Sequence, residues 1–83
     1  MDRKPIGKIT HYFDKIGVAV IELSDSLKNG EKIAIEGHSG ESFEQVVDSM
    51  QIEGKNVEKA KKGDSVGIRI GDKVHKGYRV YKV

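Results

Sequence analysis

The stretch AKKGDSVGIRIGDKVHKGYRV, residues 60–80, decides which fold class this sequence indicates. Three of its glycines each stand three positions before a valine: Gly63 before Val66, Gly71 before Val74 and Gly77 before Val80. Gly30 precedes Ile33 in the same way. Glycine adopts backbone angles that other residues resist, so this spacing is typical of tight turns followed at once by a strand. The stretch therefore predicts a small β-protein whose strands begin soon after glycine turns.

A phosphate-binding loop is the alternative that these lysine-flanked glycines raise. Such a loop needs Gly-x-x-x-x-Gly-Lys-Ser/Thr between a strand and a helix. Residues 67–73, GIRIGDK, have a different spacing, and no helical pattern follows them. Residues 37–41, GHSGE, likewise depart from the Gly-x-Ser-x-Gly nucleophile elbow, because the last glycine is displaced by one position. We therefore expect no nucleotide binding here.

Short apolar runs bounded by turn residues recur along the rest of the chain. Several alternate polar with apolar residues or are rich in β-branched residues, as half-buried strands are. The runs expected to form strands are residues 6–13, 16–23, 32–36, 66–70 and 78–83. The glycines expected at turns are Gly30, Gly37, Gly63, Gly71 and Gly77, and Gly67 is expected at a bulge or a close-packing point. Five or six short strands favour a single all-β domain, residues 1–83, built as a barrel or sandwich.

Two segments are ambiguous. In residues 41–52, Phe43, Val46, Val47 and Met50 follow the i, i+3, i+4, i+7 spacing of a helix, whereas the strand interpretation gives a less clean apolar face. The pattern alone favours a helix there. Residues 57–62 are compatible with one helical turn that ends at Gly63.

No constellation of residues indicates catalysis or a metal. The sequence has no Cys, and its histidines, His11, His38 and His75, lie too far apart for a local metal-ligand spacing. The carboxylates are scattered, so we expect no enzyme activity, no metal and no cofactor. The longest apolar run, residues 18–21, is too short to span a bilayer, so we expect a cytoplasmic protein.

Charge is distributed unevenly along the chain. Residues 1–54 hold six Lys/Arg and ten Asp/Glu, a net charge of −4, whereas residues 55–83 hold nine and three, a net charge of +6. Either the basic part forms a polyanion-binding face, or the two parts interleave in the fold and cancel. Tyr12 and Phe13 are adjacent, so on a strand they point to opposite faces. One is expected in the core, and the other either covers an end of the barrel or stacks on an unpaired base.

The sequence resembles the β-barrel that forms the second domain of translational GTPases such as elongation factor Tu. The resemblance rests on IGKIT (6–10), GVAVIELSDSLKNGEKIAIEG (17–37), VVDSMQIEGKNVEKAKKGDSVGIRI (46–70) and KVHKGYRV (73–80). It implies a closed six-stranded antiparallel barrel, with residues 41–52 as a strand. Tyr78 departs from it, because the family usually has a small acidic or polar residue there. The GTPase domain is missing, so no GTP binding is implied. Similar barrels also occur at the C-terminus of some peptidase-family proteins.

Two functions follow as hypotheses. The first is a stand-alone barrel that binds RNA, either tRNA or ribosomal RNA, or the ribosome. Phosphate contacts would come from Lys59, Lys61, Lys62, Lys73, Lys76 and Arg79, with Tyr12 or Phe13 as a stacking platform. The alternative is a protein-interaction module that docks on a separately encoded RNA-modifying or peptidase-like enzyme. Acidic residues lying among the basic ones would favour that alternative; the residues to examine are Glu22, Asp25, Glu36 and Glu44.

Overall fold

The computed structural model describes residues 4–83, so the first three positions of the expected 1–83 domain lie outside the described part. Within that part every regular element is a β-strand, which confirms the all-β class. The ten strands are β1 (Gly7–Phe13), β2 (Val18–Leu23), β3 (Leu27–Lys28), β4 (Lys32–Glu36), β5 (Ser42–Val46), β6 (Met50–Ile52), β7 (Lys55–Val57), β8 (Lys59–Ala60), β9 (Ser65–Arg69) and β10 (Arg79–Lys82).

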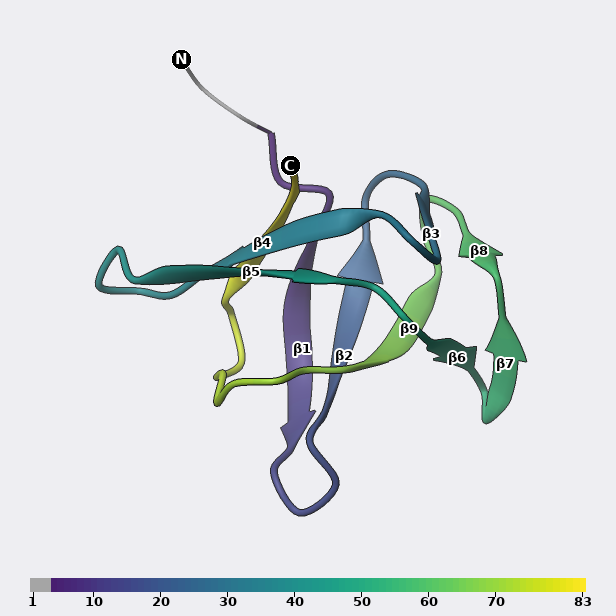
Figure 1. Ribbon diagram of the computed structural model, residues 1–83, viewed down its shortest axis with the longest axis horizontal. Coiled ribbons are helices and arrows are strands. Elements are labelled where there is room, and N and C mark those ends of the chain that lie inside the picture. Colours follow the sequence, from purple (N-terminus) through teal and green to yellow (C-terminus); the bar gives the residue numbers. More distant parts are fainter. Residues whose placement is uncertain (1–3) are drawn as a thin grey trace.

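Eight of these strands form one curled antiparallel sheet in the order β5-β4-β10-β1-β2-β9-β6-β7, and β3 pairs separately with β8. The sheet is an open half-barrel (Figure 1), so the expected closed six-stranded barrel is wrong. β5 pairs with β4 along one side and has no strand partner along the other, so it is an edge strand. The Val47 amide donates to the Glu31 carbonyl oxygen at 2.9 Å, and the Gly30 amide donates to the Val47 carbonyl oxygen at 2.7 Å. These two bonds continue the contact between the β5 and β4 segments past Val46.

The concave face of the sheet encloses a single cluster of apolar side chains. Along β1, for example, Gly7 and Ile9 are buried while Lys8 is exposed, as the two-residue repeat of a strand requires. β-Branched residues dominate the cluster because they pack well on a pleated surface. The most fully buried side chains are Ile9, Ile21, Leu27, Ile33, Ile35, Val47, Met50, Val66, Ile68, Val74 and Val80.

The helical interpretation of residues 41–52 is wrong. β5 pairs with β4 at five positions, from Lys32 opposite Val46 to Glu36 opposite Ser42. The side chain of Val46, which a helix would have buried beside Val47, is 53% exposed, whereas Val47 is fully buried. Pairing with a neighbouring strand overrides the local helical spacing because sheet structure depends on packing context.

The helical turn expected at residues 57–62 is also wrong. The chain there is extended and passes from β7 into β8. In β8, Ala60 pairs with Leu27 of β3 and Lys59 with Lys28. Leu27 and Ala60 are both buried in the core cluster, so burial of this pair accounts for the extended conformation.

Candidate functional site

Four charged side chains form a row across adjacent strands on the convex face of the sheet. Lys8 of β1 lies opposite Arg79 of β10. Arg79 in turn lies opposite Glu36 of β4, and Lys8 lies opposite Glu22 of β2. Residues directly opposite each other in paired strands project from the same face, with Cβ atoms about 5 Å apart. The row therefore carries two cations at its centre and one carboxylate at each end.

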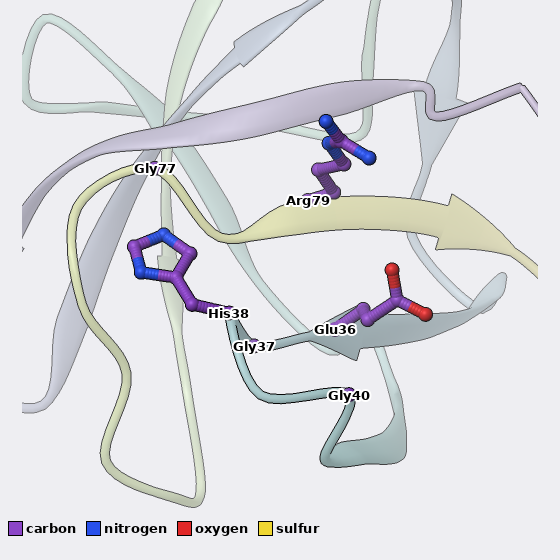
Figure 2. A pocket seen from close by; sticks show the side chains of 6 residues that line it. All are labelled: Glu36, Gly37, His38, Gly40, Gly77 and Arg79. Atoms are coloured by element: carbon purple, nitrogen blue, oxygen red, sulfur yellow. The ribbon is translucent and has the colours of Figure 1, made fainter.

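Two clefts meet at Arg79. The first encloses about 430 Å³ and is lined by Glu36, Gly37, His38, Gly40, Gly77 and Arg79. Figure 2 shows Arg79 and Glu36 projecting to the same side from neighbouring strands, with His38 standing beside Gly77. The second cleft encloses about 450 Å³ and is lined by Pro5, Gly7, Lys8, Glu22, Leu23, Ser24, Gly77 and Arg79. Both clefts include Gly77 and Arg79, so they adjoin at these residues, and we call the two clefts together the trough.

The two central cations have no anionic partner within residues 4–83. The ion pairs of that part of the chain join Lys32 to Glu44 at 3.2 Å and Lys82 to Glu31 at 3.4 Å. Like charges directly opposite each other in a sheet repel. The side chains of Lys8 and Arg79 are both exposed at this position, so both charges are accessible from solvent.

His38, which lines the first cleft, belongs to a cluster of three rings. The rings of His38 and His75 each pack edge-on against the Tyr78 ring, with centroids 5.0 and 5.6 Å apart. The Tyr78 hydroxyl donates to Glu41 Oε1 at 3.4 Å. Partial burial of the ring raises the pKa of Tyr78 above its ordinary value of 10.0, and the charge of Glu41 and its hydrogen bond raise it further.

Gly77 allows the His38 ring to approach the start of β10. Its φ is +95°, a conformation that other residues rarely adopt, and a Cβ at this position would lie 3.1 Å from His38 Nε2. Any larger residue would therefore require the His38 ring to shift. The turn after β4 and the start of β10 thus lie close together, and both contribute residues to the first cleft.

Of the other four glycines expected at turns, two have a positive φ and two do not. Gly30 and Gly63 have a φ of 93°, whereas Gly37 and Gly71 lie in connections between strands without a positive φ. Gly67 lies inside β9, where a Cβ would touch Val18 Cγ1 at 3.4 Å, so it is a point of close packing.

The side chains proposed above for RNA contact line several different clefts. Tyr12, Lys73 and Lys76 line one cleft of about 330 Å³, together with Asp14. Lys59 lines another, of about 250 Å³, beside Glu31. The remaining four are also separated: Arg79 lies in the trough, Lys61 and Lys62 lie in the turn before β9, and Phe13 ends β1.

Acidic residues lie among the basic ones. Glu36 and Glu22 flank Arg79 and Lys8 in the row, and Glu44 pairs with Lys32. Acidic residues interleaved with basic ones favour a protein partner over a polyanion. Lys8 was not among the predicted site residues, because only strand register brings it beside Arg79, which is 71 positions away.

The connection between β1 and β2 carries an exposed apolar surface, which we call the hairpin tip and define as Phe13 and Ile16. Their side chains are 51% and 62% exposed. The His11 ring stacks against the Phe13 ring with centroids 6.3 Å apart. Figure 1 shows this connection projecting beyond the sheet, at the end away from the C-terminus. Large apolar side chains on such a projection are typical of a contact with another protein surface.

Residues 4–83 contain neither a cluster of metal ligands nor a membrane-spanning helix. In that range no three His, Cys, Asp or Glu side chains gather closely enough to hold a metal ion. The same residues include no helix with the length and apolar character needed to cross a bilayer.

Comparison with known proteins identifies relatives among peptidases. No family model matches the chain. Over 76 residues, 92% of this chain, it is 46% identical to an uncharacterized protease of Methanocaldococcus jannaschii, and over 78 residues it is 35% identical to a collagenase of Porphyromonas gingivalis. The matches cover only 19% and 22% of those proteins, so the chain spans about a fifth of the curated relatives it matches.

The fold also matches that of solved structures. The C-terminal domain of a Geobacillus thermoleovorans protein assigned to the U32 peptidases superimposes with a TM-score of 0.89 at 20% identity. The superposition covers 96% of this chain and all of that domain. This chain and that domain therefore share one fold.

These findings correct the identification made from the sequence. The chain's relatives are a protease and a collagenase, and its structural neighbours are U32 peptidase domains, so the elongation-factor resemblance is wrong. The translation, RNA and ribosome function inferred from it is wrong as well. Glycine turns and alternating strands, which carried the resemblance, are shared by small curled β-sheets in general and do not distinguish these families.

Proposed function

We propose that this chain is a non-catalytic accessory module that docks on a peptidase-like catalytic unit, whether that unit is a separate protein or part of the same polypeptide. The match to the M. jannaschii protease supports this most directly, because 46% identity extends over 92% of the chain. About four fifths of that relative lies outside the match and is available for catalysis.

The hairpin tip is the surface that we assign to docking. Phe13 and Ile16 are two of the large hydrophobic side chains that remain exposed in residues 4–83. Burying such a side chain fully is worth about 1.5–3 kcal/mol, so two on one short connection supply an anchor of the kind found at the centre of protein interfaces.

Affinity capture with the tagged chain tests the docking proposal. We expect a peptidase-like protein, identified by mass spectrometry, to be recovered from cells that contain the natural partner. The double variant F13S/I16S should recover at most about a tenth as much, because both apolar anchors are lost. Val46→Ser is the matched control, since Val46 is 53% exposed on β5 and lies outside the hairpin tip. Recovery of RNA without a peptidase-like protein would contradict the proposal.

An activity assay tests the non-catalytic part separately. The purified chain alone is incubated with gelatin and with a casein substrate, and fragments are followed by gel electrophoresis. We expect no cleavage above the buffer rate. Cleavage that persists through repeated purification would show that this chain itself is catalytic.

A further inference from the structure

We propose that Arg79 and Lys8 bind the carboxylate of an extended peptide segment lying in the trough between β4 and β2. The two cations are directly opposite each other on neighbouring strands, and neither has an ion-pair partner within residues 4–83. A carboxylate placed between them would remove their mutual repulsion.

The geometry of the two side chains suits a carboxylate. The planar guanidinium of Arg79 offers two parallel N–H donors that match the two oxygens of a carboxylate. The Lys8 ammonium adds a mobile point charge from the adjacent strand. Both clefts include Arg79, so a ligand can reach the guanidinium from either direction along the trough.

The length of the trough indicates a peptide. The row crosses four strands, β4, β10, β1 and β2, which are spaced about 4.8 Å apart, so it is on the order of 14 Å long. An extended peptide advances about 3.3 Å per residue, so about four residues fit. A small acid such as acetate would leave most of the two clefts, about 430 and 450 Å³, unfilled.

The glutamates at the two ends of the row limit the ligand to a single negative charge, which lies at the centre of the row. Glu36 and Glu22 lie one strand outward from the cations on either side. A polyanion such as nucleic acid would place further negative charges against these carboxylates and be repelled. A peptide with one carboxylate and neutral flanking residues matches the row in both sign and position.

The proposed peptide site is separate from the proposed docking surface. Lys8 and the Phe13 side of the hairpin tip are five residues apart on β1, on the order of 17 Å of extended strand. Peptide binding is therefore expected to persist in F13S/I16S, and loss of docking would leave this inference standing.

Fluorescence anisotropy with labelled tetrapeptides tests the inference on the 83-residue chain. One pair compares Gly-Gly-Glu-Gly-amide with Gly-Gly-Gln-Gly-amide, and a second compares tetraglycine with a free C-terminal carboxylate against its amide. We expect saturable binding of at least one carboxylate peptide and none of its neutral counterpart. The pair that responds identifies the source of the carboxylate as a side chain or a chain terminus.

Three variants at Arg79 and Lys8, with a control at Lys62, test where the peptide binds. Arg79→Gln and Lys8→Gln should each lower the affinity for the carboxylate peptide at least about tenfold. Arg79→Lys should recover part of the loss, because it keeps the charge and lacks the planar fork. Lys62→Gln, which makes the same charge change on an exposed turn, should leave the affinity unchanged. Circular dichroism verifies that each exposed substitution leaves the fold intact.

Several results would overturn the inference. These are equal binding of the neutral peptides, no binding of either carboxylate peptide at millimolar concentration, or an unchanged affinity in both R79Q and K8Q. Binding of a uridine oligonucleotide that is abolished in R79Q would also overturn it, because the site would then accept a polyanion. In the double variant E22Q/E36Q, by contrast, oligonucleotide binding is expected to appear.

Discussion

The side chain of Gln45 joins the edge strand β5 to the end of β9, where its Nε2 donates to the Arg69 carbonyl oxygen at 2.9 Å. Its Oε1 accepts from the Gly71 amide at 3.0 Å. One side-chain amide therefore replaces the two backbone hydrogen bonds that would continue a ladder. The open half-barrel is held together at this point by a side chain and not by strand pairing.

Replacing Gln45 with Ala should lower the free energy of unfolding by about 1–2 kcal/mol, since two hydrogen bonds are lost near solvent. Gln45→Glu should cost less than Gln45→Ala, because it keeps the acceptor for the Gly71 amide. Urea denaturation followed by circular dichroism measures both. Gln51→Ala is the control. The Gln51 side chain makes one hydrogen bond, to the Asn56 side chain within the β6–β7 hairpin. Loss of that bond should cost under about 0.5 kcal/mol. Equal effects of Q45A and Q51A would show that the bridge adds nothing.

Trimming the core should distinguish buried from exposed isoleucine. Ile68 of β9 is fully buried, and Ile68→Val should lower the free energy of unfolding by about 0.5–1.5 kcal/mol, because a methylene is lost and a small cavity remains. Ile16 is 62% exposed, and Ile16→Val should change stability by under about 0.5 kcal/mol. Urea denaturation again gives both values. A loss at Ile16 as large as that at Ile68 would contradict the burial of β9.

Gly77→Ala should destabilise the fold more than Gly30→Ala. Both glycines have a similar positive φ, 95° and 93°, so each substitution should cost about 1 kcal/mol in backbone strain. A Cβ on Gly30 meets open space, whereas one on Gly77 meets His38 Nε2 at 3.1 Å. Displacing His38 from Tyr78 should add about 0.5–1 kcal/mol to the G77A loss.

A double-mutant cycle separates the cost of backbone strain at Gly77 from the cost of displacing His38. In a His38→Ala background, the cost of G77A should fall to that of G30A, as measured by thermal unfolding at neutral pH. If the cost of G77A is the same with and without His38, the close approach has no energetic consequence.

The raised pKa of Tyr78 predicts a loss of stability at high pH. Partial burial, then the charge of Glu41 and the hydrogen bond to it, favour the neutral phenol in the folded state. Above pH 10.0 the unfolded chain releases this proton before the folded chain does, so stability falls as pH rises toward the folded pKa. Below pH 10.0 both states hold the proton and the contribution is constant.

Absorbance of the tyrosinate ion measures this effect. Subtracting the Tyr78→Phe titration from that of the native chain isolates Tyr78 from Tyr12 and Tyr81, and the difference should have a midpoint above pH 10.0. Glu41→Gln should lower that midpoint toward the ordinary value, since the neighbouring charge is removed. A midpoint at or below 10.0 in the native chain would contradict the observed environment of Tyr78.

The sequence predicted the local elements well because their signals are local. Alternation and β-branched residues placed strands at residues 6–13, 16–23, 32–36, 66–70 and 78–83, and the structure has β1, β2, β4, β9 and β10 at those positions. It failed where burial depends on a distant partner. β5 pairs with β4 although the local pattern favoured a helix, and β8 pairs with β3 where the local pattern was compatible with a helical turn. The short strands β3 and β7 have no periodicity to detect.

The sequence by itself determined that this chain is all-β, with glycines at many of its connections, because residue spacing along a strand fixes which side chains share a face. Only the tertiary structure decided that the sheet stays open and that Lys8 and Arg79 form a cationic pair between two carboxylates. Strand register joins positions 71 residues apart, and no local pattern encodes it. The basic side chains that the sequence grouped by proximity in the chain line different clefts, and the proposed anion site is built from both ends of the chain.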